Sequence, residues 1–204
     1  MRRFIALTTL AAALAVPLAG QAQTTDVAGV KFANSLQVGN TRLQLNGAGI
    51  RYKVVFKVYA AALYLTDKAA TPEPVLAAPG PRHLQIVMLR EIDANELGKL
   101  FTKGMEQNAS REEFSKVIPG VIKMSDIFSS RKKLSSGDYF SIDYVPGTGS
   151  TIVVNGKPAA DPIKEPEFFN ALMKIWLGKS PADAQLKDAL LGAAKPAAAK
   201  DPFN

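Results

Sequence analysis

Residues 45–65 read LNGAGIRYKVVFKVYAAALYL, and this stretch decides the fold. It is rich in β-branched and aromatic residues, which favour strands, and it carries one arginine, Arg51, shortly after two glycines. Successive side chains of a strand point to opposite faces of a sheet. The even positions from Tyr52 to Tyr64 form an almost unbroken apolar series, so we expect this face to pack on a core.

The odd positions of the same stretch have a different character. Arg51, Lys53, Lys57 and Tyr59 give a cationic, hydroxyl-bearing half, and apolar residues continue this face to position 65. In a straight strand, Arg51 and Tyr59 would lie roughly 26 Å apart, too far for both to contact one small group. We therefore expect a hairpin, bulge or sharp bend near residues 53–55 if the two residues form one site.

The remaining chain predicts strands followed by helices. Strand patterns cover residues 27–38, 41–65, 82–91, 138–145 and 150–154. Apolar residues at helical spacing from Leu97 to Met105 predict one helix, and Ser110 with Glu113 forms a capping box that opens a second. Later helices are expected after Glu165, ending at Gly178, and from Pro181. This order predicts an α+β fold, a curved antiparallel sheet with helices packed on one face.

Three motifs give the sequence a family resemblance. The runs GAGIR and KVYAAALYL, then GDYFSIDYVPGTGSTIVVNGKP, then IWLGKSPADAQLKDALLG occur in this order over residues 30–192. Together they resemble chalcone isomerase-like proteins, and most closely an exported bacterial branch. The resemblance implies the chalcone isomerase-like fold.

The resemblance also allows the catalytic positions of the enzymes to be compared with this chain. Their arginine matches Arg51, and Asn108 corresponds to their asparagine. Tyr59 stands where the enzymes have a threonine, Leu97 near their tyrosine and Ile175 near a polar residue. The set of catalytic residues found in the isomerases is therefore incomplete in this chain. Plant relatives that bind fatty acids, holding a carboxylate with an arginine and a tyrosine on these strands, resemble the chain better.

The N-terminal residues of the chain predict export. Residues 1–22 have a basic start, an apolar stretch and a small-residue site ending at Ala22, which is typical of a cleaved signal peptide. We expect a periplasmic protein with one domain at 23–192 and a disordered tail at 193–204. Loss of Arg2 and Arg3 would change the net charge from +7 to 23 − 18 = +5, a mildly basic balance without the clustered basic patch of a nucleic-acid binder.

The small numbers of cysteine and histidine residues limit the kinds of catalytic and metal sites that the chain can form. The chain has no cysteine and one histidine, His83, which excludes disulfides and thiolate sites and leaves little material for a metal cluster or a serine-histidine dyad. His83 is expected to be a structural strand residue. No cofactor-binding motif is found, since Gly47 and Gly49 lack the spacing of a phosphate-binding loop.

These observations lead to a functional hypothesis. We predict a non-catalytic binding protein for a fatty acid or similar amphipathic carboxylate, with Arg51, Tyr59 and Asn108 as ligand-binding residues and no cofactor, metal, nucleic acid or integral membrane segment in the mature chain. The expected apolar lining comes from the sheet and the helices. The candidates are Leu63, Leu97, Phe101, Met105, Phe169, Leu172 and Trp176.

Two alternatives remain open at this point. An isomerase would need a replacement donor or base from among Tyr52, Lys57, Tyr64 and Asn108. A structural module of the cell envelope would instead show a closed core, with Arg51 paired internally to Asp143 or Glu91.

Overall fold

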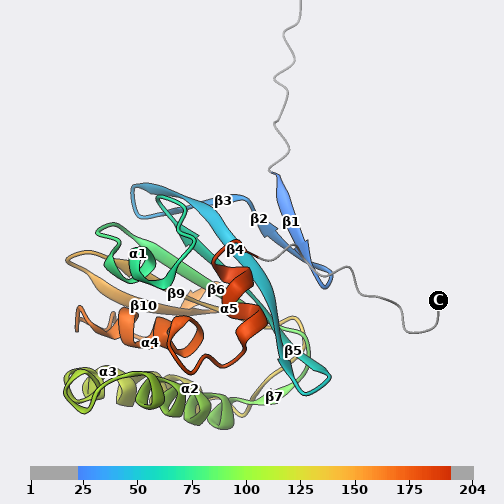
Figure 1. The fold of residues 1–204 in the computed structure, drawn as a ribbon. Coiled ribbons are helices and arrows are strands. Elements are labelled where there is room, and N and C mark those ends of the chain that lie inside the picture. Colours follow the sequence, from blue (N-terminus) through green and yellow to red (C-terminus); the bar gives the residue numbers. More distant parts are fainter. Residues whose placement is uncertain (1–22, 194–204) are drawn as a thin grey trace, which may run out of the picture.

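A computed structural model describes residues 23–193 of the chain. The predicted signal peptide and the predicted tail beyond Ala193 lie outside these residues. Within them, the expected α+β fold is confirmed, and the helices α2, α3 and α4 lie together on one side of a curved sheet (Figure 1).

The central sheet has seven strands, and every neighbouring pair is antiparallel. Two smaller strand pairs accompany it, β1 (Thr24–Val27) with β2 (Val30–Ala33) and β7 (Ile92–Asp93) with β8 (Lys133–Leu134). In spatial order the central strands are β11 (Lys157–Pro158), β10 (Gly149–Val154), β9 (Tyr139–Val145), β6 (Arg82–Met88), β5 (Phe56–Leu65), β4 (Thr41–Lys53) and β3 (Ser35–Val38).

The stretch at 41–65 forms a hairpin of two strands. Lys53 pairs with Phe56 across a two-residue turn, and the register is irregular between Arg51 and Tyr52. Arg51 lies directly opposite Tyr59. The prediction of one strand over 41–65 was therefore wrong, and the hairpin that a shared Arg51–Tyr59 site required is present.

Both faces of β5 are buried, so its even residues from Ala60 to Tyr64 pack on a core as predicted, while Val54 and Phe56 at the turn are exposed and the odd face is buried as well. The odd residues Tyr59, Ala61, Leu63 and Leu65 belong to the large cluster between the sheet and the helices. The even residues contribute to a second cluster on the opposite face, which also includes Val27 of β1 and Phe32 of β2. These even residues are Ala60, Ala62 and Tyr64. The short β1–β2 pair supplies the cover that the sequence pattern did not reveal.

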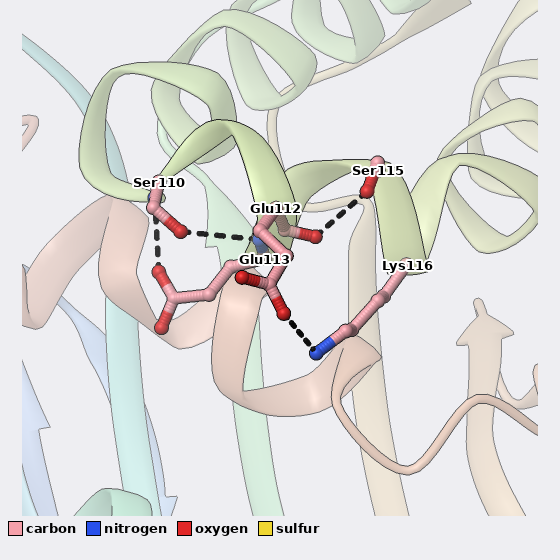
Figure 2. A network of polar contacts seen from close by, with 5 residues as sticks. All are labelled: Ser110, Glu112, Glu113, Ser115 and Lys116. Carbon is pink, nitrogen blue, oxygen red and sulfur yellow. Dashed lines mark hydrogen bonds and ion pairs between the residues drawn. The ribbon is translucent and has the colours of Figure 1, made fainter.

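The helices follow the sequence signals closely. α2 (Ala94–Asn108) is capped by Asp93, and α3 (Arg111–Ser129) opens with the predicted capping box. The Ser110 hydroxyl accepts from the backbone N–H of Glu113 at 3.1 Å, and the Glu113 carboxylate accepts from the Ser110 N–H at 2.9 Å (Figure 2). α4 (Phe168–Leu177) ends at Gly178 as expected.

Two helical details differ from the sequence analysis. The last helix, α5 (Ala184–Leu190), begins after Asp183 rather than at Pro181, because the Asp183 carboxylate caps it by accepting from the N–H of Leu186. The short α1 (Pro72–Ala77) was not predicted. The buried Arg82 guanidinium donates to backbone carbonyls at the end of α1 and to Asn170 of α4, and it thereby fixes α1 to the domain.

Candidate functional site

A cavity of about 390 Å³ opens beside the turn end of the β4–β5 hairpin. The hairpin, β7, one face of α2, the end of α4 and the loop before α5 enclose it. Its size falls in the range of small-molecule sites. The lining is mainly apolar and consists of Arg51, Lys53, Val58, Tyr59, Ile92, Leu97, Leu100, Phe101, Lys103, Gly104, Gln107, Ile175, Ser180, Pro181 and Ala182.

Arg51 and Tyr59 enter the cavity together because they are cross-strand partners. The Tyr59 oxygen accepts a hydrogen bond from the indole N–H of Trp176 at 2.8 Å. An indole nitrogen can only donate, so this contact fixes the Tyr59 oxygen as the acceptor and leaves the phenolic proton free to donate. Within residues 23–193, no hydrogen bond uses that proton. The cavity therefore contains a hydroxyl donor without an acceptor.

The buried environment of Tyr59 keeps its hydroxyl protonated. Burial raises the pKa of Tyr59 to about 12, outweighing the Trp176 hydrogen bond and the positive charge of Arg51, which both lower it. The phenol is consequently neutral at physiological pH. It can donate to an anion but cannot serve as a base.

Arg51 is only loosely neutralised. Its guanidinium lies 3.8 Å from the Asp183 carboxylate, at the long end of ion-pair distances. That carboxylate already accepts from the backbone N–H of Tyr52 at 2.9 Å and of Leu186 at 3.1 Å. A guanidinium has five N–H donors in a planar fork, so Arg51 retains donors for a ligand carboxylate.

The arrangement suits an amphipathic anion. Arg51 and Tyr59 provide a cation and a neutral donor at one end, and the exposed Lys53 and Lys103 add positive charge to the lining. The remaining surface is apolar apart from Gln107 and Ser180. No group of three or more histidine or carboxylate side chains suited to a metal ion occurs in the described part of the chain.

The structure separates the predicted lining residues into two groups. Leu97 and Phe101 line the cavity. The other five candidates are fully buried in the core between sheet and helices and do not line it, so their predicted role was wrong. They are Leu63, Met105, Phe169, Leu172 and Trp176.

Asn108 lies near the cavity but is not part of its lining. Its amide donates to the carbonyls of Gly104 and Ser180 at 2.9 Å, and its oxygen accepts from the Ser180 N–H at 2.8 Å. The side chain is thus engaged with backbone and fixes the loop that supplies Ser180, Pro181 and Ala182 to the cavity. The structure does not bring Asn108 together with Arg51 and Tyr59 as a third ligand contact.

The partners proposed for Arg51 in the structural alternative were wrong. Asp143 contacts His83 on the neighbouring strand, and Glu91 pairs with Lys133 at 2.7 Å. The actual neighbour, Asp183, was missed, although its place before the last apolar helical stripe was a capping signal. His83 lies within β6 at the centre of the sheet, as its structural assignment predicted.

Two apolar lining residues bear on catalysis. The family resemblance placed polar enzyme residues near Leu97 and Ile175, and both of these side chains face the cavity. Its lining includes no carboxylate and no histidine. Of the side chains commonly used for proton transfer, the lining contains Tyr59 and the lysines Lys53 and Lys103.

Comparison with known proteins identifies the family. A model described as chalcone isomerase-like matches residues 24–192. The chain belongs to the chalcone isomerase-like family. No curated protein matches this chalcone isomerase-like protein. Its fold is similar to the crystal structure of an Arabidopsis thaliana fatty-acid binding protein, with a TM-score of 0.64, 13% identity, and coverage of 80% of this chain and 92% of the other.

The described helices are also informative about membranes. None of those in residues 23–193 has the length and apolar character needed to cross a bilayer.

Proposed function

We propose that this protein binds a fatty acid or a similar amphipathic carboxylate without transforming it. The observation that carries the proposal is the pairing of Arg51 with a Tyr59 hydroxyl whose proton has no acceptor in residues 23–193, beside an apolar cavity. The fold shared with a plant fatty-acid binding protein supports it. Export through residues 1–22 would place this binding in the periplasm.

The energetics divide the affinity between the two ends of the ligand. A charge-assisted pair with Arg51 contributes about 1.5–3 kcal/mol. Each buried methylene contributes about 0.8 kcal/mol, so an acyl chain supplies most of the affinity and the headgroup supplies selectivity. The ligand class is therefore defined by an apolar chain that ends in one carboxylate.

The same cavity argues against isomerase activity. A neutral Tyr59, an apolar Leu97 and an apolar Ile175 leave Arg51 able to hold an anion but provide no paired acid and base. Binding without turnover is what this lining supports.

Calorimetric titration with dodecanoate and with the uncharged dodecanol tests the proposal. The two probes share an apolar chain, so their difference isolates the carboxylate. We expect Arg51→Gln to weaken dodecanoate binding by roughly 10- to 150-fold, corresponding to about 1.5–3 kcal/mol, and to leave dodecanol binding nearly unchanged. Arg42→Gln is the matched control, because Arg42 lies on the same strand but is exposed and contacts Ser35.

Mass spectrometry of small molecules extracted from the purified protein complements the titration. A fatty acid that copurifies with wild type and with Arg42→Gln, but not with Arg51→Gln, would support the carboxylate anchor. Equal binding of dodecanoate and dodecanol to wild type would refute that anchor. Failure of both probes to bind would reject the cavity as an acyl site.

A further inference from the structure

The turn of the β4–β5 hairpin exposes three consecutive large apolar residues. Val54, Val55 and Phe56 are 88%, 75% and 58% exposed. They lie at the end of the hairpin, which projects from the sheet beside β7 (Figure 1). Three adjacent apolar side chains at a protruding tip are not covered by any described part of this chain.

The chemistry of this turn is unusual for a hairpin. Two-residue turns favour glycine, asparagine or aspartate, because they need a positive φ. Here the first central residue is Val54, with a φ of 59°, a region that β-branched residues rarely adopt. Apolar side chains are present at this tip despite the local conformational cost.

The charged side chains of the hairpin itself are all basic, and the Asp183 carboxylate, which also lies beside Val54 and Val55, is largely buried. No acidic residue occurs in the sequence between Asp26 and Asp67. Lys53 and Lys57 flank the apolar turn and are exposed, and the Arg90 guanidinium lies 5.0 Å from the centre of the Phe56 ring. An apolar tip flanked by the exposed basic residues Lys53, Lys57 and Arg90 is complementary to a surface that is negatively charged outside and apolar beneath.

From these features we infer that the β4–β5 hairpin tip docks on an anionic phospholipid bilayer. Val54, Val55 and Phe56 enter the boundary between headgroups and acyl chains, while Lys53, Lys57 and Arg90 contact lipid phosphates. A second copy of this chain fits the tip less well, since two such tips would bring like charges together. An anionic bilayer satisfies both the apolar and the cationic parts of the tip.

The hairpin tip lies next to the cavity, so docking of the tip would affect where the cavity lies relative to the bilayer. Lys53 and Val58, on either side of the turn, both line the cavity, and so does Leu100, which is 50% exposed. Docking would place these lining residues close to the lipid surface, where fatty acids partition. This consequence rests on the proposed function, whereas the docking itself does not.

Flotation of the purified mature protein with vesicles tests the inference. The vesicles contain either phosphatidylcholine alone or phosphatidylcholine with phosphatidylglycerol, and no fatty acid. We expect binding to the anionic vesicles only, with a decrease of roughly fivefold for each basic residue removed near the surface. High salt should weaken the binding because it screens these charges.

Variants localise the contact. Val55→Ser combined with Phe56→Ser should abolish flotation, and Lys57→Gln combined with Arg90→Gln should weaken it at least tenfold. Ile122→Ser on α3 is the matched apolar control, since Ile122 is 56% exposed. Lys157→Gln with Lys164→Gln is the charge control, because both lysines are exposed and Lys157 lies on β11, at the other edge of the sheet from the hairpin.

A tryptophan reporter adds a direct readout. In Phe56→Trp, quenching by brominated lipids would show insertion of the tip, while the fully buried Trp176 provides a constant background. The inference is overturned by absence of vesicle binding, by equal binding to neutral vesicles, or by hairpin variants that float like wild type. A wild-type dimer that the Val55→Ser and Phe56→Ser changes dissociate would also overturn it. Titration with dodecanoate in the absence of vesicles tests the proposed function separately, so failure of vesicle docking can be distinguished from failure of fatty-acid binding.

Discussion

Tyr59 has a defined hydrogen-bonding direction because of one neighbour. A tyrosine hydroxyl can donate or accept, but the Trp176 indole can only donate. Their 2.8 Å contact therefore assigns the Tyr59 oxygen as acceptor to Trp176 and leaves its proton without an acceptor among residues 23–193. A phenylalanine at position 59 would leave the buried indole N–H without a partner, so Tyr59 is both a binding residue and a partner in the core.

Asp183 and a bound carboxylate should compete for Arg51. Asp183→Ser removes the negative charge 3.8 Å from the guanidinium, and serine is a good helix cap that can still accept from Leu186. We expect dodecanoate to bind roughly two- to fivefold more tightly to the variant, which is the effect of about 0.4–1 kcal/mol typical of a partly exposed pair. Calorimetric titration measures the change.

Asp188→Ser is the control for this substitution, because Asp188 is an exposed carboxylate on the same helix. It should leave the affinity unchanged. Weaker binding to Asp183→Ser would mean that Asp183 orients Arg51 rather than competing for it.

At the scale of elements, the contact between β4 and α5 depends on three neighbouring residues of β4, which are Asn46, Gly47 and Gly49. Asn46 lies at a register irregularity of β4 and is buried. Its side chain exchanges hydrogen bonds with the backbone of Ala69 and donates to the carbonyl of Leu190 at 2.7 Å. Gly47 and Gly49 follow, and the absence of their side chains allows α5 to approach the strand. Asp183 directly precedes α5, so the contact between β4 and α5 also positions Asp183 beside Arg51.

Gly47→Ala should be strongly destabilising. A Cβ at position 47 would lie 2.0 Å from the carbonyl oxygen of Ala189 and 2.8 Å from that of Leu190, and backbone atoms cannot move aside as side chains do. We expect a loss of about 3 kcal/mol or more in the free energy of unfolding, measured by urea denaturation. Gly80→Ala is the control, because its nearest contact would be a side-chain methyl of Thr66 at an ordinary 3.4 Å. A Gly47→Ala variant as stable as Gly80→Ala would contradict the close packing of α5 on β4.

The sequence predicted local elements better than long-range neighbours. The capping box at Ser110 and the end of α4 at Gly178 follow from local spacing, whereas chain geometry gave the hairpin only as a condition for Arg51 and Tyr59 to share a site. Asp183 and Trp176 are more than 100 positions from their partners in the site, so no local pattern could pair them. The five core residues mistaken for cavity lining show the same limit, because helical spacing identifies a buried face but not where packing leaves space.

At the scale of the molecule, the sheet separates two buried apolar clusters, and each contains a buried tyrosine. Tyr59 belongs to the cluster beneath the helices, and Tyr64 to the cluster on the opposite face. Burial raises the pKa of each to about 12. The Tyr64 hydroxyl has no hydrogen-bond partner among residues 23–193, so its burial is unfavourable even when it is neutral.

These two tyrosines make the protein sensitive to alkaline pH. A tyrosine in the unfolded chain titrates near pH 10, whereas in the folded state Tyr59 and Tyr64 retain their protons to about pH 12. The folded state binds more protons between these values, so stability is fully present below pH 10 and falls as the pH rises to 12, by up to about 1.4 kcal/mol per pH unit for each tyrosine. Urea denaturation across this range should show the fall in the free energy of unfolding.

Tyr64→Phe should make this fall with pH less steep while changing stability little at pH 7, because the lost hydroxyl was unpaired. Tyr59→Phe should also flatten it but cost about 1–3 kcal/mol at pH 7, because Trp176 loses its acceptor. A Tyr64→Phe profile as steep as that of wild type would show that Tyr64 does not contribute to the alkaline loss.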